Sequence, residues 1–385
     1  MTRPRLTAAG WGVLALGSVA LAAGGWLGWT ELLVLGASGV ALVALGLLVV
    51  MVPPVARAEL SLVPARTWVD GEARAELVLR PGLVPLLAPV VEVPVEGRPP
   101  GRGPTRVRLP FLLPGRLHRE AIAVSTTRRG IHRVGPVTHL HSDVLGLVRR
   151  RQEWAQPADL FVRPRIVGLE SLRGGIVHDL EGVVSDRLSA SDLAFHALRE
   201  YVTGDDLRHV HWTSSARASG LLVRQYEETH RAHVTIVVDE RRSSYRVRSE
   251  HELAVSVAAS VALQATQDDF EVFLVSGQVA VEATTPDLLL DGCCRMTLGG
   301  EPLGPVCVRA GTLAAGTSLA FVISGSQVDL AELQLAGSSF PADALRLLVR
   351  ADRDAQSSTT PASGFGAVTV GDLAHLPVLL QGSVR

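Results

Sequence analysis

Two apolar segments without a charged side chain stand at the start of the chain. They run over residues 6–28 and 32–52, and only the residues from Trp29 to Glu31 separate them. An α-helix rises about 1.5 Å per residue, so each segment is long enough to cross a hydrocarbon core about 30 Å thick. Residues 1–56 are therefore predicted to form a tight transmembrane α-hairpin. Within it, Gly24 and Gly28 have the spacing of a close helix contact.

The arginines that flank these segments predict their orientation. Two arginines precede the first segment, Arg57 and Arg66 follow the second, and the connection carries no positive charge. Because cytoplasmic flanks are enriched in basic residues, a multi-pass cell-membrane protein with a cytoplasmic soluble region is expected. A rival interpretation treats the first segment as a cleaved signal peptide, since residues 20–22 (Ala-Leu-Ala) fit a small-residue cleavage site. The soluble region stays cytoplasmic under both interpretations.

Composition restricts the functions that are open to the rest of the chain. With 385 residues, two or three domains are expected. The net charge of -1 gives no electrostatic support for a nucleic-acid partner. The sequence contains no lysine, which excludes a self-sufficient P-loop ATPase and Schiff-base chemistry through lysine. Cys293, Cys294 and Cys307 have no metal-site spacing, so reduced cytosolic thiols are expected.

Residues 57–165 consist of short runs in which apolar and polar residues alternate, with proline and glycine clusters between them. Alternation with a period of two predicts strands, and the run of strands predicts an antiparallel β-sandwich-like domain. Arg149, Arg150 and Arg151 form a basic flank near its end. This flank would lie near anionic lipid if it faced the bilayer, but a solvated strand end is the preferred interpretation.

Residues 232–385 follow a different pattern, in which short apolar strands alternate with helical segments. This pattern predicts a C-terminal α/β domain with a doubly wound, mainly parallel sheet. Residues 249–267 are predicted to form an amphipathic helix that begins with a capping box of Ser249 and Glu252.

Candidate ligand residues stand at the ends of two of these strands. Asp239 and Ser243 follow the first strand, and Ser324 ends a later one. Ligands on doubly wound sheets bind at the carboxyl ends of the strands, so these side chains are the first to consider. The signal is weak, because an aspartate and a serine stand at strand ends in most α/β folds.

The connecting segment, residues 166–231, contains the densest cluster of charged and aromatic side chains. Its motif, R-E-Y-x-x-G-D-x-x-R-x-x-x-W, and an arginine shortly after it comprise Arg199, Glu200, Tyr201, Gly204, Asp205, Arg208, Trp212 and Arg217. The arginines can pair with the acids in bidentate geometry, which favours a salt-bridged joint between domains. Docking of a partner is the second interpretation. Catalysis with Glu200 or Asp205 as a base is the least favoured, because no nucleophile–base pair accompanies the charges.

This motif, with the following strand that ends in an aspartate, resembles an uncharacterised family, the domain of unknown function numbered fifty-eight. The resemblance implies two N-terminal membrane helices, a β-rich segment, the motif and a von Willebrand factor A-like domain. Members of that family tend to be encoded beside MoxR-type AAA+ ATPases and transglutaminase-like membrane proteins. The implied partners are therefore an ATPase of that type and a transglutaminase-like membrane protein.

Von Willebrand factor A-like domains often hold Mg²⁺ through a D-x-S-x-S motif after the first strand, since carboxylate and hydroxyl oxygens suit that ion. The matching residues in this chain are Asp239, Arg241 and Ser243. Arg241 replaces the first serine and puts a cation where a ligand oxygen belongs. A degenerate, metal-free site is expected, with Asp239 and Ser243 as weak candidates for Mg²⁺.

Two further pairs could bind a metal, His139 with His141 and His209 with His211, because alternate residues of a strand share a face. The sequence offers no third or fourth ligand for either pair, so metal binding there is not expected.

The sequence and the resemblance together predict a bacterial, non-enzymatic, membrane-anchored scaffold. It would act with a MoxR-type AAA+ ATPase in envelope-related assembly or protein maturation. The alternative is a divalent-metal-dependent protein, either an adhesion-type ligand binder or a hydrolase, that uses Asp239 and Ser243.

Overall fold

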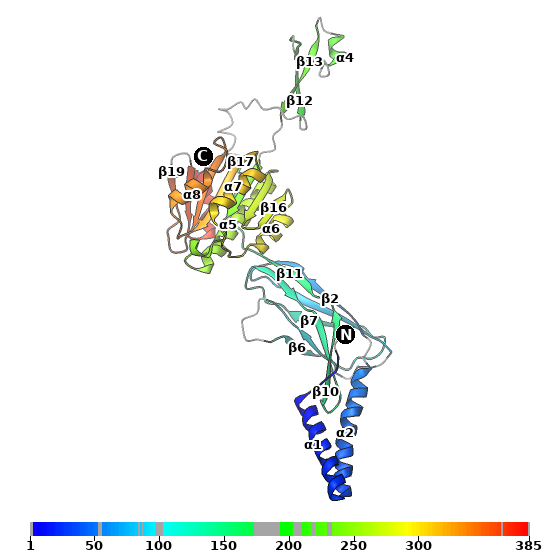
Figure 1. Cartoon of the computed structure of the whole chain (residues 1–385). Helices are drawn as coiled ribbons and strands as arrows, with labels where there is room; N and C mark the ends of the chain where they lie inside the picture. The colour runs from blue at the N-terminus through cyan, green and yellow to red at the C-terminus, as the bar shows by residue number, and fades with distance from the viewer. Residues whose placement is uncertain are drawn as a thin grey trace. The chain divides into compact units, whose positions relative to one another are not determined.

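The structure is a computed structural model that describes residues 3–52, 56–83, 85–86, 88–96, 103–172, 193–202, 210–217, 220–228, 233–362 and 365–383. Within these ranges the side chains of residues 193–200, 224–228, 361–362 and 382–383 are outside the description. The chain divides into two compact units, Met1–Pro164 and Arg165–Arg385 (Figure 1).

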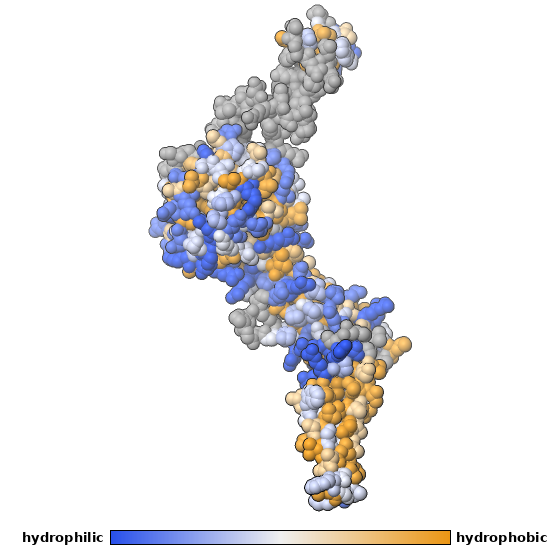
Figure 2. All heavy atoms as spheres, viewed as in Figure 1, coloured by the Kyte–Doolittle hydropathy of each residue, from blue (hydrophilic) through white to orange (hydrophobic). Residues whose placement is uncertain are grey.

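The first unit begins with two long apolar helices, α1 (Ala8–Leu27) and α2 (Thr30–Met51). The side chain of Thr7 caps α1 by accepting a hydrogen bond from the amide of Gly10 at 3.1 Å. Both helices are long and apolar enough to cross a membrane, judged by length and composition. Apolar side chains cover most of their visible surface (Figure 2). These findings match the two apolar segments of the sequence.

Glycines set the contact between the two helices. A Cβ atom added to Gly17 would lie 3.2 Å from the carbonyl oxygen of Gly36, and one on Gly24 would lie 2.8 Å from the amide nitrogen of Leu33. Gly28 has φ 70 and ends α1 in the left-handed conformation, with open space where its Cβ would be. The expected contact through Gly24 and Gly28 is therefore wrong for Gly28, because the chain leaves the helix there.

Short strands make up the rest of the first unit. They are β1 (Arg5–Leu6), β2 (Ala56–Val63), β3 (Arg66–Trp68), β4 (Arg74–Pro81), β5 (Val90–Val93), β6 (Thr105–Arg108), β7 (His118–Ala123), β8 (Gly130–Val134), β9 (Val137–Ser142), β10 (Val148–Ala155) and β11 (Ala158–Arg163). They form sheets in the orders β1-β10-β9-β5-β6, β3-β11-β8 and β2-β4-β7. All these pairs are antiparallel except β11 with β3. Alternate residues of β4, such as Leu77 and Leu79, enter a common apolar core. The predicted antiparallel strands are confirmed.

The second unit is built on a seven-stranded sheet in the order β16-β15-β14-β17-β18-β20-β19. Its strands are β14 (His233–Val238), β15 (Glu271–Ser276), β16 (Val279–Ala283), β17 (Thr317–Gly325), β18 (Leu345–Ala351), β19 (Ser358–Ala362) and β20 (Phe365–Val370). The two edge strands, β16 and β19, are antiparallel to their neighbours, and the inner five run parallel. Next to β14, the order runs to β15 on one side and to β17 on the other, which is the topology of a doubly wound sheet.

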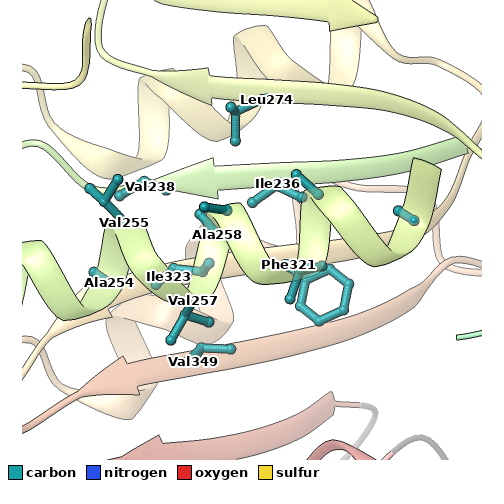
Figure 3. Packing of buried hydrophobic residues seen from close by; sticks show 14 of the residues in the cluster. Ile236, Val238, Ala254, Val255, Val257, Ala258, Leu274, Phe321, Ile323 and Val349 are labelled. Carbon is teal, nitrogen blue, oxygen red and sulfur yellow. The ribbon is translucent and has the colours of Figure 1, made fainter. Parts of the chain in front are cut away.

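Helices cover both faces of this sheet. They are α5 (Arg248–Gln267), α6 (Pro286–Arg295), α7 (Leu303–Leu313), α8 (Leu330–Gly337) and α9 (Leu376–Ser383), with short 3-10 turns η2 (Arg242–Ser244) and η3 (Leu373–His375). Residues of α5 and α6 share one apolar cluster with Ile236, whereas those of α7 and α8 share another with Val237. Alanines such as Ala254 and Ala258 bring α5 close to the central strands (Figure 3).

The start of α5 and the segment before residue 173 differ from the expected arrangement. Val247 is the N-cap of α5, so the predicted capping box of Ser249 and Glu252 does not form. The predicted connecting segment begins at residue 166, yet the amide of Val167 donates to Ser260 of α5 at 3.1 Å. Apolar side chains of residues 166–172 pack on the same core. This part of the segment therefore belongs to the α/β body rather than to a linker.

Candidate functional site

The strand order of the sheet reverses between β14 and β17, and Asp239 lies at this switch point. It follows the last residue of β14, and its amide donates to the carbonyl oxygen of Ile323 in β17 at 2.8 Å. Ser324, also in β17, lies beside it. Ligands of doubly wound sheets bind at such carboxyl ends, so this is the first place to look for chemistry.

The carboxylate of Asp239 is buried, and donors from its own chain surround it. The hydroxyl groups of Ser244 and Ser324 donate to Oδ2 at 2.6 and 2.8 Å. The backbone amide of Arg241 donates to Oδ1 at 3.0 Å, and its guanidinium Nη2 donates to Oδ2 at 2.9 Å. The side chain has 0% exposure, so these bonds replace the water that it loses on folding.

Arg241 joins this carboxylate to a second acid. Its Nη1 atom lies 2.8 Å from Oε1 of Glu332 in α8. Hydrogen bonding to Asp239, more than any other cause, raises the pKa of Arg241 above its ordinary value. The guanidinium therefore stays charged, and it takes the position against Asp239 that a bound cation would occupy.

Tyr245 is a buried residue that contacts the backbone of Asp239. Its hydroxyl group donates to the carbonyl oxygen of Asp239 at 2.5 Å. Burial raises the pKa of Tyr245 well above its ordinary value, and the charge of Asp239 adds to that effect. The phenol is therefore a neutral, fixed hydrogen-bond donor.

The structure brings Asp239, Arg241 and Ser324 together, as their places in the sequence suggest, but it replaces Ser243. Ser243 is exposed, and the neighbouring Ser244 is buried and bonded to Asp239. The reason is the 3-10 turn η2, which returns every third residue to the same side. The D-x-S-x-S spacing assumes an extended loop, so it missed Ser244. It could not find Glu332 either, because that residue comes from a helix far along the chain.

Only one of the two histidine pairs, His139 with His141, lies fully within the described residues. The rings of His139 and His141 have centroids 5.7 Å apart, and His139 stacks on Trp154 at 4.2 Å. His211 Nδ1 lies 2.8 Å from the hydroxyl of Ser214, while His209 lies outside the described residues. Among the residues that the structure describes, no group of three or more His, Cys, Asp or Glu side chains is placed to hold a metal ion.

The three cysteines are buried. Burial raises the pKa of Cys307 to about 12, so its reactive thiolate form is scarce at neutral pH. The predicted reduced thiols are consistent with these positions.

The charged motif begins in a hairpin of β12 (Leu193–Glu200) and β13 (Leu222–Glu228), called here the motif hairpin. Arg199 pairs with Val223 and Glu200 with Leu222 along its backbone. Gly204, Asp205 and Arg208 lie outside the described residues. The predicted pairing of its arginines with its acids therefore stays a prediction.

The described end of the motif hairpin carries the remaining motif residues. The short helix α4 (Trp212–Ser215) is capped by His211, whose Nδ1 accepts from the amide of Ser214. The Ser215 hydroxyl accepts from the amide of Leu222 at 2.8 Å and so ties α4 to β13. Tyr201 is half-buried and its amide donates to Leu221. These bonds link Tyr201 and α4 to the residues at the start of β13.

Two large motif side chains of this turn face outward. Trp212 is 62% exposed, and Arg217 is exposed as well. Val202, which follows Tyr201, is 63% exposed. An exposed tryptophan beside an arginine is typical of the residues that contribute most to protein–protein binding.

Comparisons with known proteins relate this chain to one family. Residues 197–287 match the family described as "Protein of unknown function DUF58". The match includes the motif hairpin from Ala197 onward and the Asp239 turn, but not Ser324 or Glu332. None of the curated proteins matches the chain.

Solved structures share only limited likeness with the chain. A CARDB domain from Pyrococcus furiosus, crystallised in complex with di-metal ions, is 18% identical over 28% of this chain and 93% of that chain, with a TM-score of 0.21. Its solution structure gives 17% identity, the same 28% of this chain, 94% of that chain and the same TM-score of 0.21. The GH2 beta-galacturonidase from Eisenbergiella tayi bound to galacturonate is 8% identical over 76% of this chain and 47% of that chain, with a TM-score of 0.17.

Proposed function

Because residues 197–287 match the DUF58 family of proteins of unknown function, we propose that the chain is a membrane-anchored, non-enzymatic scaffold whose motif hairpin docks a protein partner. Helices α1 and α2 anchor it by crossing the membrane, with the soluble region in the cytoplasm. The resemblance implies a MoxR-type AAA+ ATPase as the partner, and envelope-related assembly or protein maturation as the process.

One observation carries the docking proposal, namely the exposure of Trp212 at 62% on a turn fixed by internal hydrogen bonds. A rigid aromatic side chain loses little conformational freedom on binding, so it contributes much of its apolar area to affinity. The exposed Arg217 adds a donor that can pair with a carboxylate of the partner.

The non-enzymatic part of the proposal is supported by the occupation of Asp239. Its carboxylate accepts from Arg241, Ser244 and Ser324 of the same chain. A divalent ion would have to displace the guanidinium, and the two positive charges would repel each other. We therefore propose a metal-free site that fixes the carboxyl edge of the sheet.

We also propose that the α/β unit is von Willebrand factor A-like. Support comes from a mainly parallel sheet with helices on both faces and with an antiparallel edge strand, β16, next to β15. The aspartate after the first strand lies where that class commonly binds its metal. In this chain an arginine takes the ion's place, which fits a domain that binds partners through another surface.

The docking proposal is tested by binding the full chain, in detergent, to a purified MoxR-type ATPase. The variants Trp212→Ala and Arg217→Ala are expected to bind more weakly. Trp68→Ala is the matched control, because Trp68 is also exposed, at 40%, but lies in the first unit. Undiminished binding of both variants would refute docking through the motif hairpin and leave it a structural joint.

The metal-free proposal is tested by measuring Mg²⁺ and Zn²⁺ in the purified full chain after incubation with each ion. Substoichiometric metal is expected both in the natural chain and in the variant Asp239→Ala. Stoichiometric metal that disappears in Asp239→Ala would favour the alternative, a metal-dependent ligand binder or hydrolase at Asp239.

A further inference from the structure

A second β-hairpin, formed by β9 and β10, ends in a tip of five residues, Asp143–Leu147, that lies against α1 and α2. We propose that this tip, called here the β9–β10 tip, inserts into the lipid leaflet beside the two helices. Its ligand is the phospholipid bilayer, with acyl chains around the apolar side chains and anionic headgroups on the arginines behind them. This inference rests on the proposed crossing of the membrane by α1 and α2.

The tip contacts the start of α1 through hydrogen bonds. The amide of Thr7 donates to the carbonyl oxygen of Leu147 at 2.9 Å, and its hydroxyl donates to that of Gly146 at 2.8 Å. A Cβ atom on Gly10 would lie 2.2 Å from the Leu147 oxygen, so only glycine permits this approach. The tip is therefore fixed alongside the first turn of α1.

The β9–β10 hairpin also contacts α2 at two levels, which show how far along this helix the tip reaches. Nη1 of Arg150 donates to the carbonyl oxygen of Met51, the last residue of α2, at 3.2 Å. Closer to the tip, Asp143 Cγ would lie 3.3 Å from a Cβ atom on Gly46. Gly46 precedes Met51 by five residues, which is about 7.5 Å of helix. The tip therefore lies alongside the last turns of α2, within the apolar length of that helix.

Lipid offers no hydrogen-bond partners to the polar groups of the tip, so these groups need partners within the protein. Asp143 is buried, and its Oδ1 and Oδ2 accept from the amides of Val148 at 2.6 Å and Leu145 at 3.0 Å. Its carbonyl oxygen accepts from the amide of Gly146 at 3.1 Å. The oxygens of Gly146 and Leu147 accept from Thr7. These internal bonds remove much of the cost of placing a turn in a dry environment.

The tip exposes two apolar side chains. Val144 is 100% exposed and Leu145 is 59% exposed. Apolar side chains of α2 at the same level, such as Leu45 and Leu48, are also exposed, at 58% and 64%. The tip and the helix thus both expose apolar side chains at this level, and the acyl chains that surround the helix would also surround the tip.

Two arginines lie behind the tip, on strands β1 and β10. Arg149 of β10 pairs directly with Arg5 of β1, and both are exposed. Like charges opposite each other on adjacent strands are destabilising in water. They become favourable beside anionic phospholipid headgroups, which lie at the level where the helices leave the hydrocarbon core. The short strand β1 therefore places an arginine pair at the headgroup layer.

The experiment uses the full chain in vesicles of phosphatidylcholine and phosphatidylglycerol, with a nitrobenzoxadiazole label on one introduced cysteine. The three variants are Val144→Cys at the tip, Leu45→Cys in α2 and Ser125→Cys. Ser125 is exposed and lies two residues after Ala123, which pairs with Arg74. Arg74 also pairs with Val63, at the end of β2 that is farther along the chain from α2. The native cysteines are buried, and the unaltered chain measures their background labelling.

Labels on Val144→Cys and Leu45→Cys are expected to be quenched by lipids that carry a spin label in the acyl chain, and to be several-fold less sensitive to aqueous iodide than the label on Ser125→Cys. Lipid quenching at Leu45 with aqueous behaviour at Val144 would overturn the insertion of the tip alone. Aqueous behaviour at Leu45 would overturn the membrane crossing of α2, and the insertion of the tip with it.

Discussion

Arg241 and Arg217 each lie next to a serine-containing turn of the second unit, but they face different surroundings. Arg241 precedes η2, is 20% exposed in its side chain and binds the buried Asp239. Arg217 follows α4, and its amide donates to Ser214 while its side chain is exposed. The residue types of the two turns are alike. The buried acid beside Arg241 gives that arginine a role in the fold, whereas the exposed Arg217 is the one that we propose to meet a partner.

The largest effect is expected from Arg241→Ala. Loss of the guanidinium leaves the Asp239 carboxylate buried with three weaker donors, the hydroxyls of Ser244 and Ser324 and one backbone amide. Breaking a buried ion pair on one side destabilises a protein by about 3–5 kcal/mol. Amide hydrogen exchange along β14, measured by mass spectrometry on the full chain, reports this change locally.

The control for that variant is Arg248→Ala. The side chain of Arg248 is 68% exposed and lies 4.0 Å from Glu252, a surface pair for which about 0.5 kcal/mol or less is expected. Equal exchange rates in the two variants would contradict the structural role of the Asp239–Arg241 pair. Unchanged binding of the ATPase by Arg241→Ala, at a temperature where it is folded, would keep the two turns functionally separate.

The sequence located Asp239 correctly because a buried parallel strand has an unambiguous apolar run, and the residue after it must stand at the carboxyl edge of the sheet. It also placed the apolar segments well, since residues 6–28 and 32–52 contain most of α1 and α2. Both features depend on local patterns. Glu332 depends on the packing of α8 against the sheet, which no local pattern records.

The exposure of Trp212 could not be predicted for a similar reason. A tryptophan among charged residues fits a stacked, shielded joint as well as an open surface, and only the hydrogen bonds of α4 with β13 place it outside. Ser244 was missed because the 3-10 turn changes which residue faces Asp239. Side-chain direction in a short turn follows from its backbone, which the sequence leaves open.

A buried polar group of the first unit gives the second prediction and extends the comparison. His139 is 3% exposed, and its Nδ1 is buried without a hydrogen-bond partner among the described residues. Burial, with a smaller contribution from His141, lowers the pKa of His139 from 6.5 to about 4. The folded state therefore favours the neutral form of this imidazole.

The sign follows from proton binding. Between pH 4 and 6.5 the unfolded chain binds a proton at His139 and the folded chain does not, so stability is complete above about pH 6.5 and falls as the pH drops to about 4. The loss is about 3 kcal/mol. Hydrogen exchange along β9 and β10 as a function of pH measures it. His139→Phe is expected to remove this dependence, whereas His118→Phe, at a surface pair with Glu120, keeps it.

The third prediction concerns the outward turn. Trp212→Ala is expected to weaken binding of the MoxR-type ATPase by about 2 kcal/mol, roughly 30-fold in Kd, as for an aromatic anchor of an interface. Its effect on stability should stay within about 0.5 kcal/mol, because the side chain is 62% exposed. Calorimetric titration measures the affinity. A loss of stability without a loss of affinity would reverse the comparison and make the motif hairpin a structural joint.

The smallest effect distinguishes two neighbouring serines. Ser244→Ala removes a hydroxyl that donates to the buried Asp239 carboxylate at 2.6 Å, and a lost hydrogen bond to a charged group costs about 1.5 kcal/mol. Ser243→Ala changes an exposed side chain and should cost less than about 0.5 kcal/mol. Exchange rates along β14 measure both variants on one scale. A larger effect at Ser243 would mean that the loop after Asp239 is extended, as the D-x-S-x-S spacing assumes, and that the carboxylate is arranged for a metal ion rather than for Arg241.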